Sequence, residues 1–150
     1  MKHVLPLTYE PKIKNVRNGV CRQTIRPVSV KKPKKVGDLV MFHGWSGKPY
    51  ASPWSWRTDY FIITEVFTIK FQIKRNFEKA VFEGDILKDN NPMSEPDKED
   101  LAVRDGFKDL QDMYSYFFFN YPELRDMLFK TIRWDKDASK KLVQRKFSVR

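Results

Sequence analysis

The sequence predicts one domain of the α+β class, in which short strands dominate and an amphipathic helix lies late in the chain. Apolar and polar residues alternate over residues 67–74, which is the pattern of a strand with one buried face. Farther along, apolar residues recur at helical spacing. They are Phe107, Leu110, Met113, Tyr114, Phe117 and Phe118. With 150 residues, of which 41% are hydrophobic and 15% aromatic, the chain is long enough to bury one sizeable core.

The N-terminal part predicts a strand, a short helix and a second strand. Residues 4–7 are apolar enough for a strand. Residues 10–16 suit a helix that ends at Asn18-Gly19, a common C-terminal stop signal. The second strand follows this glycine and ends at Pro27.

The middle of the chain predicts one buried strand and one long loop. A tight turn at Gly37-Asp38 leads into an apolar run over residues 39–42, which suits a buried strand. Residues 43–60 are rich in glycine, serine, proline and aromatic residues, so we expect a loop there. Loops of that length inside a small domain are usually functional or disordered, and the tryptophans argue against disorder.

The C-terminal part predicts further strands around the amphipathic helix. Residues 59–74 suit two strands or one bent strand, and residues 79–87 suit another. Residues 94–100 are acidic and predict a loop or the start of a helix. We expect a final strand over residues 127–134 and a basic tail over residues 138–150.

The positive charge is concentrated in the first half of the chain. The net charge is +10, yet residues 1–75 carry 15 Lys and Arg against 4 Asp and Glu, whereas residues 76–150 carry 14 against 15. A localised positive surface attracts polyanions, of which nucleic acid is the commonest. Solubility alone is the alternative explanation. A basic amphipathic membrane helix is disfavoured, because the basic residues cluster in loops and strands.

Residues 19–26 read Gly-Val-Cys-Arg-Gln-Thr-Ile-Arg, a glycine turn followed by a short strand with polar residues at alternate positions. On a strand, Arg22, Thr24 and Arg26 would project to one face, where a hydroxyl between two guanidiniums suits an anion or a nucleotide. The opposite face would carry Cys21, Gln23 and Ile25. An edge strand with a solvated basic face is the alternative interpretation.

The spacing of this segment resembles the signature Gly-x-Lys-x-x-Thr-x-Arg of the ASCH domains, which belong to the PUA-like superfamily. Gly19, Thr24 and Arg26 match the signature, and Cys21 stands where the family usually has lysine. The resemblance covers most of residues 3–134. It implies a PUA-like β-barrel with flanking helices, which we expect to span residues 1–137.

The same resemblance implies an alternative, enzymatic function. Some ASCH proteins look like amidohydrolases of acetylated cytidine, so this chain would be a hydrolase on a modified nucleoside or a ribonuclease. Thr24 would be the nucleophile, Asp105 the acid–base partner across a cleft, and Cys21 would replace the lysine. A thiol differs from an amine as a proton acceptor and is itself a nucleophile. Independently of the resemblance, Asp105 is a candidate N-cap for the helix that follows it.

Aromatic and basic residues interleave in the predicted loop, a composition typical of surfaces that bind unpaired bases. Rings stack on bases while cations meet phosphates, so we predict binding of RNA or single-stranded nucleic acid. The predicted contacts are Arg22, Arg26, Lys31, Lys32, Lys34, Lys35, Trp45, Lys48, Tyr50, Trp54, Trp56 and Arg57. Some of the tryptophans are expected to fold back over the core. A protein-interaction module remains as a third function class.

Several other classes find no support in the sequence. His3, His43 and Cys21 lack the spacing of a metal site, and residues 44–48 lack the spacing of a phosphate-binding loop, so neither a metal nor a cofactor is expected. A single cysteine cannot form an internal disulfide. No apolar run approaches the roughly 18 residues that cross a bilayer. We therefore expect a monomeric cytoplasmic protein without a membrane partner.

Overall fold

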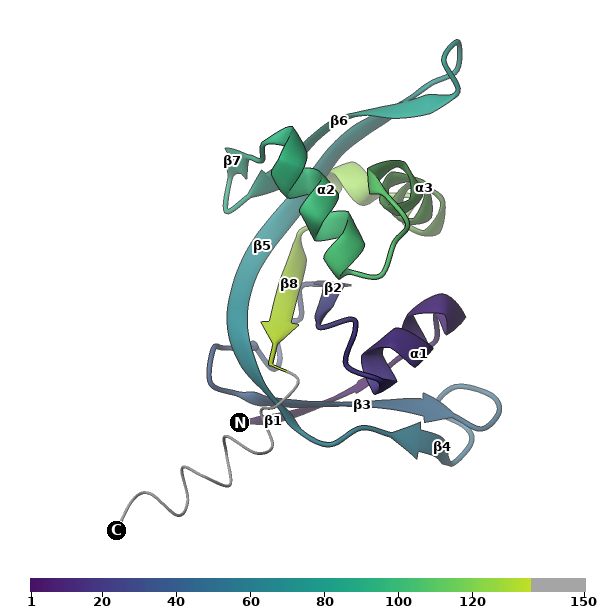
Figure 1. The fold of residues 1–150 in the computed structure, drawn as a ribbon, viewed down its shortest axis with the longest axis vertical. Helices are drawn as coiled ribbons and strands as arrows, with labels where there is room; N and C mark the ends of the chain where they lie inside the picture. The colour runs from purple at the N-terminus through teal and green to yellow at the C-terminus, as the bar shows by residue number, and fades with distance from the viewer. Residues whose placement is uncertain (136–150) are drawn as a thin grey trace. The chain divides into compact units, whose positions relative to one another are not determined.

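The computed structural model describes residues 1–135, and the predicted basic tail over residues 138–150 lies outside the described residues. The chain is of the α+β class, as predicted (Figure 1). In chain order its elements are β1 (Lys2–Pro6), α1 (Glu10–Arg17), β2 (Gln23–Pro27), β3 (Leu39–Trp45), β4 (Trp54–Arg57), β5 (Phe61–Asn76), β6 (Val81–Lys88), β7 (Asn91–Pro92), α2 (Glu95–Arg104), α3 (Leu110–Asn120), the short 3₁₀ helix η1 (Leu124–Asp126) and β8 (Phe129–Trp134).

The strands form a mixed sheet whose main order is β1-β3-β5-β6-β7. Strand β4 also pairs with β3, and β8 pairs with both β2 and β5. Within residues 1–135 the sheet is open, because its pairings do not return to their starting strand.

The described chain packs as two compact units. The first unit consists of residues 1–22, 34–66 and 132–135, and the second consists of residues 23–33 and 67–131. Both β5 and β8 pass from one unit into the other, so each unit takes part of these two strands.

In the first unit, β3 is the central strand. It pairs with β1 in parallel, from Lys2 with Leu39 to Pro6 with His43. On its other edge it pairs antiparallel with β4 and with the start of β5. Between β4 and β5, Thr58 continues the ladder, because its N–H donates to the Phe42 carbonyl at 2.8 Å and its hydroxyl accepts from the Phe42 N–H at 3.0 Å.

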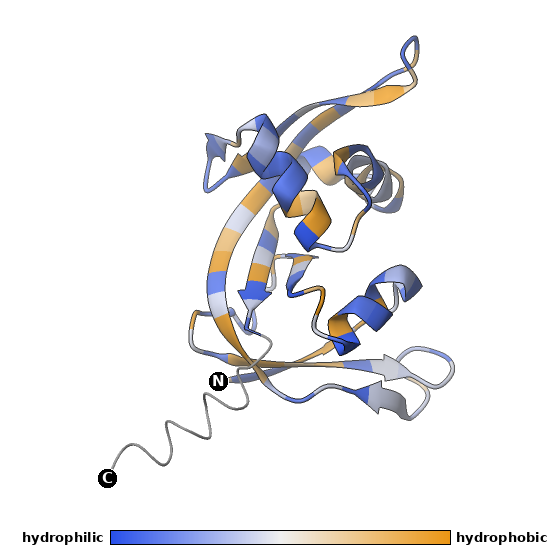
Figure 2. Ribbon diagram, viewed as in Figure 1, coloured by the Kyte–Doolittle hydropathy of each residue, from blue (hydrophilic) through white to orange (hydrophobic). Residues whose placement is uncertain are grey.

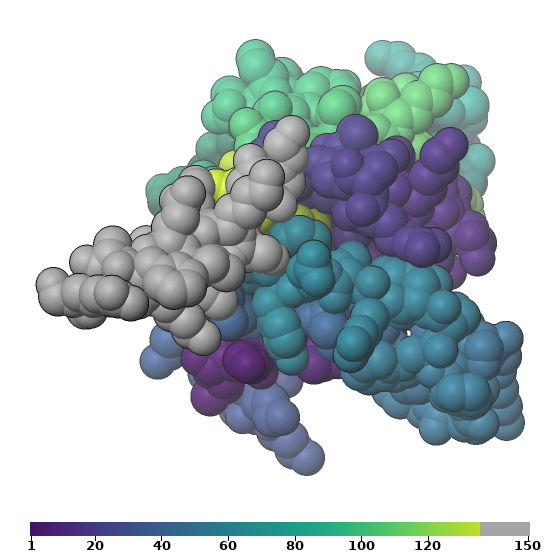
Figure 3. Space-filling view, turned by 60° about the horizontal axis from the view of Figure 1, so that its bottom comes forward, coloured from purple at the N-terminus to yellow at the C-terminus, as the bar shows by residue number. Residues whose placement is uncertain are grey.

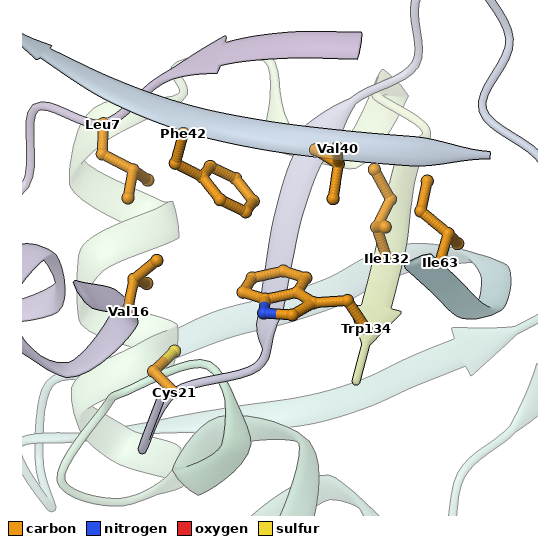
Figure 4. Close-up of a cluster of buried hydrophobic side chains, with 8 residues drawn as sticks. All are labelled: Leu7, Val16, Cys21, Val40, Phe42, Ile63, Ile132 and Trp134. Carbon is orange, nitrogen blue, oxygen red and sulfur yellow. The ribbon is translucent and has the colours of Figure 1, made fainter. Parts of the chain in front are cut away.

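An apolar cluster fills the first unit beneath β3 (Figure 4). Its members are Leu7, Val16, Cys21, Val40, Phe42, Ile63, Ile132 and Trp134. The indole of Trp134 lies 4.7 Å from the ring of Phe42, measured between centroids. Burial of these side chains provides the main driving force for folding of this unit.

The turn ahead of β3 is fixed by a hydrogen bond between buried His3 and half-buried Asp38. His3 Nε2 of β1 donates to Asp38 Oδ2 at 2.9 Å, and the backbone N–H of Lys35 donates to the same oxygen at 3.1 Å. The His3 hydrogen bond lowers the pKa of the Asp38 carboxyl, and it outweighs the opposing effect of burial. The Gly37-Asp38 turn predicted from the sequence is therefore held at the N-terminus of the parallel β1–β3 pair.

In the second unit, β5 and β6 form a long antiparallel hairpin, paired from Ile69 with Lys88 to Asn76 with Val81. The predicted alternation is confirmed, since Ile69, Phe71 and Ile73 are buried and the residues between them are more exposed, and Figure 2 shows the alternating hydropathy along β5. Helix α3 supplies Phe117, which stacks on Phe71 at 4.5 Å between ring centroids. The apolar face of the hairpin and the buried face of α3 thus share one core.

Three sequence predictions need correction. Residues 43–60 are not one loop, because β3 continues to Trp45 and β4 occupies Trp54–Arg57. The amphipathic helix begins at Leu110, so Phe107 is buried ahead of it. The motif strand begins at Gln23 rather than after Gly19.

The solvated-face interpretation of the motif strand is wrong for Thr24. Gln23, Thr24 and Ile25 are all buried, and Arg26 is half-buried. The strand β2 pairs with β8 along one edge, and with Thr24 buried its polar residues do not form a solvated face. Arg22 lies before the strand and is exposed.

Candidate nucleic-acid interface

The β3–β4 hairpin carries most of the predicted aromatic contacts, and a β-bulge determines their directions. His43 pairs with Arg57 and Gly44 pairs with Trp56, but Trp45 pairs with Trp54, so Ser55 is an extra residue on β4. In a regular strand Trp54 and Trp56 would share a face. The bulge instead places them on opposite faces of the hairpin.

One face of this hairpin, called here the outer face, holds a cluster of four rings. The imidazole of His43 stacks on the indole of Trp54, with 4.2 Å between ring centroids and 21° between ring planes. Trp45 meets His43 edge-on at 4.8 Å, and Tyr50 leans on Trp45 at 5.0 Å. These distances lie within the range in which aromatic pairs attract.

Two of the four rings are open to solvent. Tyr50 is 80% exposed and Trp54 is 44% exposed, whereas His43 is 3% exposed. The Nε1 atom of Trp45 is buried and has no hydrogen-bond partner among residues 1–135. The outer face therefore presents two rings that rest on two more deeply placed ones. Figure 3 shows the surface of this part of the chain in space-filling form, in blue.

The turn between the strands is tied by its own side chains. Ser46 donates through its N–H and its hydroxyl to the Pro53 carbonyl, both at 2.9 Å. Ser52 accepts from the Gly47 N–H at 3.0 Å and donates to the Lys48 carbonyl at 2.8 Å. These bonds leave the Lys48 side chain exposed at the tip. A turn held in this way loses less entropy when it binds a ligand.

Tyr50 has an unusual backbone conformation within this turn. Its φ is +62°, in the left-handed region that bulky residues rarely adopt. Such strain costs about 1–3 kcal/mol and is found mainly at functional sites. In this conformation the exposed ring lies 5.0 Å from the ring of Trp45, measured between centroids.

Trp56 lies on the inner face and belongs to the core. It packs against the apolar cluster beneath β3, and the guanidinium of Arg17 lies 5.2 Å from its ring centroid. A side chain at Gly44 would overlap the Trp56 indole, so glycine is the residue that lets this ring close over the strand. Of the predicted stacking residues, Trp56 is therefore the one that is not available to a base.

The excess positive charge of the described residues belongs to the first unit. Its described residues carry ten Lys and Arg against five Asp and Glu, a net charge of +5, while the second unit carries thirteen against thirteen. Of the predicted basic contacts, the first unit contains Arg22, Lys34, Lys35, Lys48 and Arg57. The second unit contains Arg26, Lys31 and Lys32. Lys48 and Arg57 are both exposed and both lie on the hairpin that carries the outer face.

The predicted catalytic carboxylate is buried against the motif strand. Asp105 is 5% exposed, and its Oδ1 accepts a hydrogen bond of 3.1 Å from Gln23 Nε2 on β2. The same amide nitrogen donates to the Leu101 carbonyl at 2.9 Å. Gln23 of β2 thus contacts the acid directly.

Asp105 does not cap the following helix. It is the C-terminal residue that closes α2, and Gly106 follows it with a φ of +97°. The N-cap of α3 is Asp109, whose side chain accepts from the Asp112 N–H at 2.8 Å. The dipeptide Asp105-Gly106, a common helix end, is the sequence signal that distinguishes the two roles.

Cys21 is 3% exposed within the apolar cluster of the first unit, where Figure 4 shows it beside Val16. A lysine at this position would place an ammonium group among hydrocarbon side chains. The departure from the ASCH signature at Cys21 is therefore matched by an apolar environment.

Among residues 1–135, no three His, Cys, Asp or Glu side chains gather as metal ligands do. The helices in the same range are too short or too polar to span a bilayer. In comparisons with known proteins, no family model, no curated protein and no solved structure matches this chain.

Proposed function

We propose that this protein binds RNA or single-stranded nucleic acid through the outer face of the β3–β4 hairpin. The observation that carries the proposal is the half-exposed indole of Trp54, which stacks on the buried imidazole of His43 at 4.2 Å. A ring held flat by a buried partner is a ready platform for a base, because no side-chain freedom has to be lost on binding.

The outer face has room for one or two bases. Tyr50 and Trp54 offer the exposed rings, and each base stacked on an aromatic ring contributes about 1–3 kcal/mol. Lys48 and Arg57 supply positive charge on the same hairpin. Duplex readout would not use such rings, since paired bases keep their faces stacked within the helix.

Further phosphate contacts are proposed for the remaining basic residues. They are Arg22, Arg26, Lys31, Lys32, Lys34 and Lys35. Lys31, Lys32 and Lys35 are exposed. They lie within residues 26–35, which hold five basic residues and no acid, a composition that suits the backbone of a polyanion. This assignment is weaker than that of the hairpin, because no ring accompanies these cations.

The finer fold assignment is also a proposal. We propose that the chain is a variant of the PUA-like β-barrel of the ASCH type. Support comes from the signature residues Gly19, Thr24 and Arg26, and from a parallel β1–β3 pair with a helix between its strands. The pairings among residues 1–135 leave the sheet open, so the assignment needs further strand pairing to hold. An experimental structure in which the strands close into a barrel would support it, and one in which the sheet stays open would contradict it.

A titration tests the binding proposal. Short RNA, single-stranded DNA and a duplex of the same sequence are each added at two salt concentrations, with tryptophan fluorescence as the signal. Single strands should bind more tightly than duplex. The logarithm of the affinity should fall with the logarithm of salt concentration, with a slope of about −0.7 for each phosphate neutralised.

Matched variants make this experiment specific to the outer face. Trp54→Ala should weaken binding about 5- to 100-fold, as expected for one lost base stack. Phe119→Ala, which removes an exposed ring of the second unit, is the control and should leave binding unchanged. Lys48→Gln should reduce the salt slope, whereas Lys108→Gln should not. Equal effects of Trp54→Ala and Phe119→Ala, or a flat salt profile, would contradict the proposal.

A hydrolase is the second candidate, favoured by one observation. The carboxylate of Asp105 is near the motif strand, although it contacts Gln23 directly, whereas the ASCH resemblance implies an acid across a cleft. Against this, its Oδ1 is engaged by Gln23, and Thr24 is only 3% exposed. The test is turnover of acetylated cytidine or cleavage of RNA by the purified protein. Thr24→Ala should abolish that activity without unfolding the protein, and retained activity would remove Thr24 from the mechanism.

A further inference from the structure

We propose that an aromatic surface of the second unit docks an acidic, apolar segment of a partner protein. This surface, called here the phenylalanine–arginine patch, consists of Arg75, Phe77, Phe82, Phe118 and Phe119. It lies on the second unit, whereas the hairpin proposed to bind nucleic acid belongs to the first. The two proposals therefore stand or fall separately.

The patch forms at the end of the β5–β6 hairpin and on the exposed side of α3, where these elements are no longer covered by the core. Arg75 of β5 pairs with Phe82 of β6, so both side chains leave the same face of the hairpin. Figure 1 shows this end of the hairpin extending beyond α2 and α3. On α3, Phe117 fills the core, and the next two phenylalanines cannot point in the same direction. Phe118 is consequently 36% exposed and Phe119 is 61% exposed.

The guanidinium of Arg75 sits among three rings. Its central carbon lies 5.5 Å from the centroid of Phe77, 5.5 Å from that of Phe82 and 5.6 Å from that of Phe119. These are cation–π distances. Phe82 also contacts Phe118 at 5.1 Å between centroids. The rings and the cation thus form one continuous surface rather than scattered apolar residues.

The centre of the patch is held in place by α3. The amide of Gln111 accepts a hydrogen bond from the Phe82 N–H and donates one to the Phe82 carbonyl, both at 2.8 Å. This side chain takes the place of a neighbouring strand at the edge of β6. Phe82 is therefore positioned before any partner arrives, and a positioned anchor loses less entropy on binding.

Arg75 offers hydrogen-bond donors that the described chain does not use. Rings that cover the faces of a guanidinium leave its N–H groups pointing outward in the plane. Within residues 1–135, Arg75 has no hydrogen bond and no ion pair, whereas Arg104 pairs with Asp100 at 2.8 Å and Arg133 pairs with Glu65 at 3.0 Å. A carboxylate is the group that such a fork binds in bidentate fashion.

The charge around the patch favours a protein partner over nucleic acid. Residues 67–131 carry ten Lys and Arg against thirteen Asp and Glu, so this region lacks the extended positive surface that a polyanion needs. A single carboxylate needs only one cation, and Arg75 supplies it. A short segment with one carboxylate beside a large apolar side chain would satisfy both Arg75 and the rings. Interfaces enriched in aromatic residues and arginine are the usual form of such a hot spot.

Peptide selection tests the proposal on the full chain. A display library of random dodecapeptides is selected on the wild-type protein and counter-selected on Arg75→Gln. The enriched peptides should place Asp or Glu next to Phe, Leu or Trp. One enriched peptide is then synthesised, together with a version in which Asn and Gln replace its acids. Affinities are measured by fluorescence anisotropy, and NMR shifts locate the binding surface.

Arg75 and Phe119 are exposed, so their substitution should not unfold the protein, and circular dichroism checks this. Arg75→Gln and Phe119→Ser should each weaken binding of the acidic peptide at least tenfold. Replacement of the peptide's acids by Asn and Gln should weaken binding to the wild type by the same factor. Lys74→Gln is the matched control, because it removes the same charge from the neighbouring residue on the opposite face of β5 and should have no effect. NMR shifts should map to residues 75–82 and 118–119.

Four outcomes would overturn the proposal. One is a selection that returns no peptide able to distinguish the wild type from Arg75→Gln. Another is a peptide with Asn and Gln in place of its acids that binds as tightly as the acidic one. The third is dimerisation of the free protein that Phe119→Ser abolishes, since the occupant would then be a second copy. The last is binding of single-stranded RNA that Arg75→Gln weakens and Trp54→Ala does not.

Discussion

Gln23 donates a hydrogen bond to the Asp105 carboxylate at 3.1 Å, joining two buried residues that are 82 positions apart in the sequence. The bond connects the motif strand β2 to the C-terminal end of α2. It is the contact that relates the signature segment to the acid that the sequence singled out.

Removing this amide should destabilise the protein. Gln23→Leu keeps a similar volume but removes two buried hydrogen bonds, one to the Asp105 carboxylate and one to the Leu101 carbonyl, so we expect a loss of about 2–4 kcal/mol in the free energy of unfolding. Urea denaturation followed by circular dichroism measures it. Gln72→Leu, at an exposed position of β5, is the control and should stay within about 0.5 kcal/mol. A loss below about 1 kcal/mol for Gln23→Leu would show that this bond is not structurally important.

The close approach of Trp56 to β3 makes Gly44 sensitive to any added side chain. The methyl group of Gly44→Ala would overlap the Trp56 indole, so we expect a loss of about 1–3 kcal/mol in the free energy of unfolding. Gly47→Ala is the matched control in the same hairpin, since the nearest atom to its Cβ would be that of Ser52 at 3.6 Å. Thermal unfolding of the two variants should therefore differ clearly. Similar melting temperatures would contradict the placement of Trp56.

The Asp38 carboxyl should contribute to the decline in the free energy of unfolding at low pH. Its pKa is lowered from the ordinary value of 3.8, mainly by the hydrogen bond from His3. The unfolded chain then binds the proton more readily, so the contribution is complete above about pH 4 and is lost as the pH falls through the lowered value. Urea denaturation between about pH 5 and pH 2 should show a steeper decline for the wild type than for Asp38→Asn. If the stability of the wild type and of Asp38→Asn declined in parallel as the pH falls, Asp38 would not be a cause of the decline.

Tyr50 offers a way to separate stability from binding. Tyr50→Asn removes the exposed ring but introduces a residue that tolerates a φ of +62°. Relief of the backbone should offset the lost contact with Trp45, which leaves the free energy of unfolding within about 0.5 kcal/mol. Binding of single-stranded RNA should nevertheless weaken severalfold, because one stacking ring is gone. Unchanged affinity in a fluorescence titration would exclude Tyr50 from the interface.

Local periodicity was sufficient to predict most of the secondary structure. The strands β1, β3, β5, β6 and β8 and the helices α1 and α3 all overlap their predicted ranges. The strand β4 was missed because it has only four residues and lies in a stretch rich in glycine, serine and proline, which is typical of loops. Its residues do alternate in polarity, but the bulge at Ser55 places the two tryptophans on opposite faces, so the alternation does not report which face is buried. Only pairing with β3, a contact between distant residues, makes this segment a strand.

The candidate site was predictable in composition but not in arrangement. The sequence pointed to the aromatic residues of the hairpin and to the basic first half of the chain. It could not separate Trp54 from Trp56, since their directions depend on the pairing register. The burial of Thr24 and the role of Gln23 also escaped, because both follow from β2 lying between β8 and the residues at the end of α2.

The extra residue of β4 has an evolutionary consequence. Without Ser55, Trp54 would directly precede Trp56, and the same cross-strand pairs would form a regular ladder with the two indoles still on opposite faces. Gain of one residue between Gly44 and Trp45 would remove the irregularity in the other way, because Ser55 would acquire a partner and Trp45 and Trp54 would turn to the face of Trp56. Descendants of this gene would therefore keep the stacking surface after a deletion on β4 and lose it after an insertion on β3.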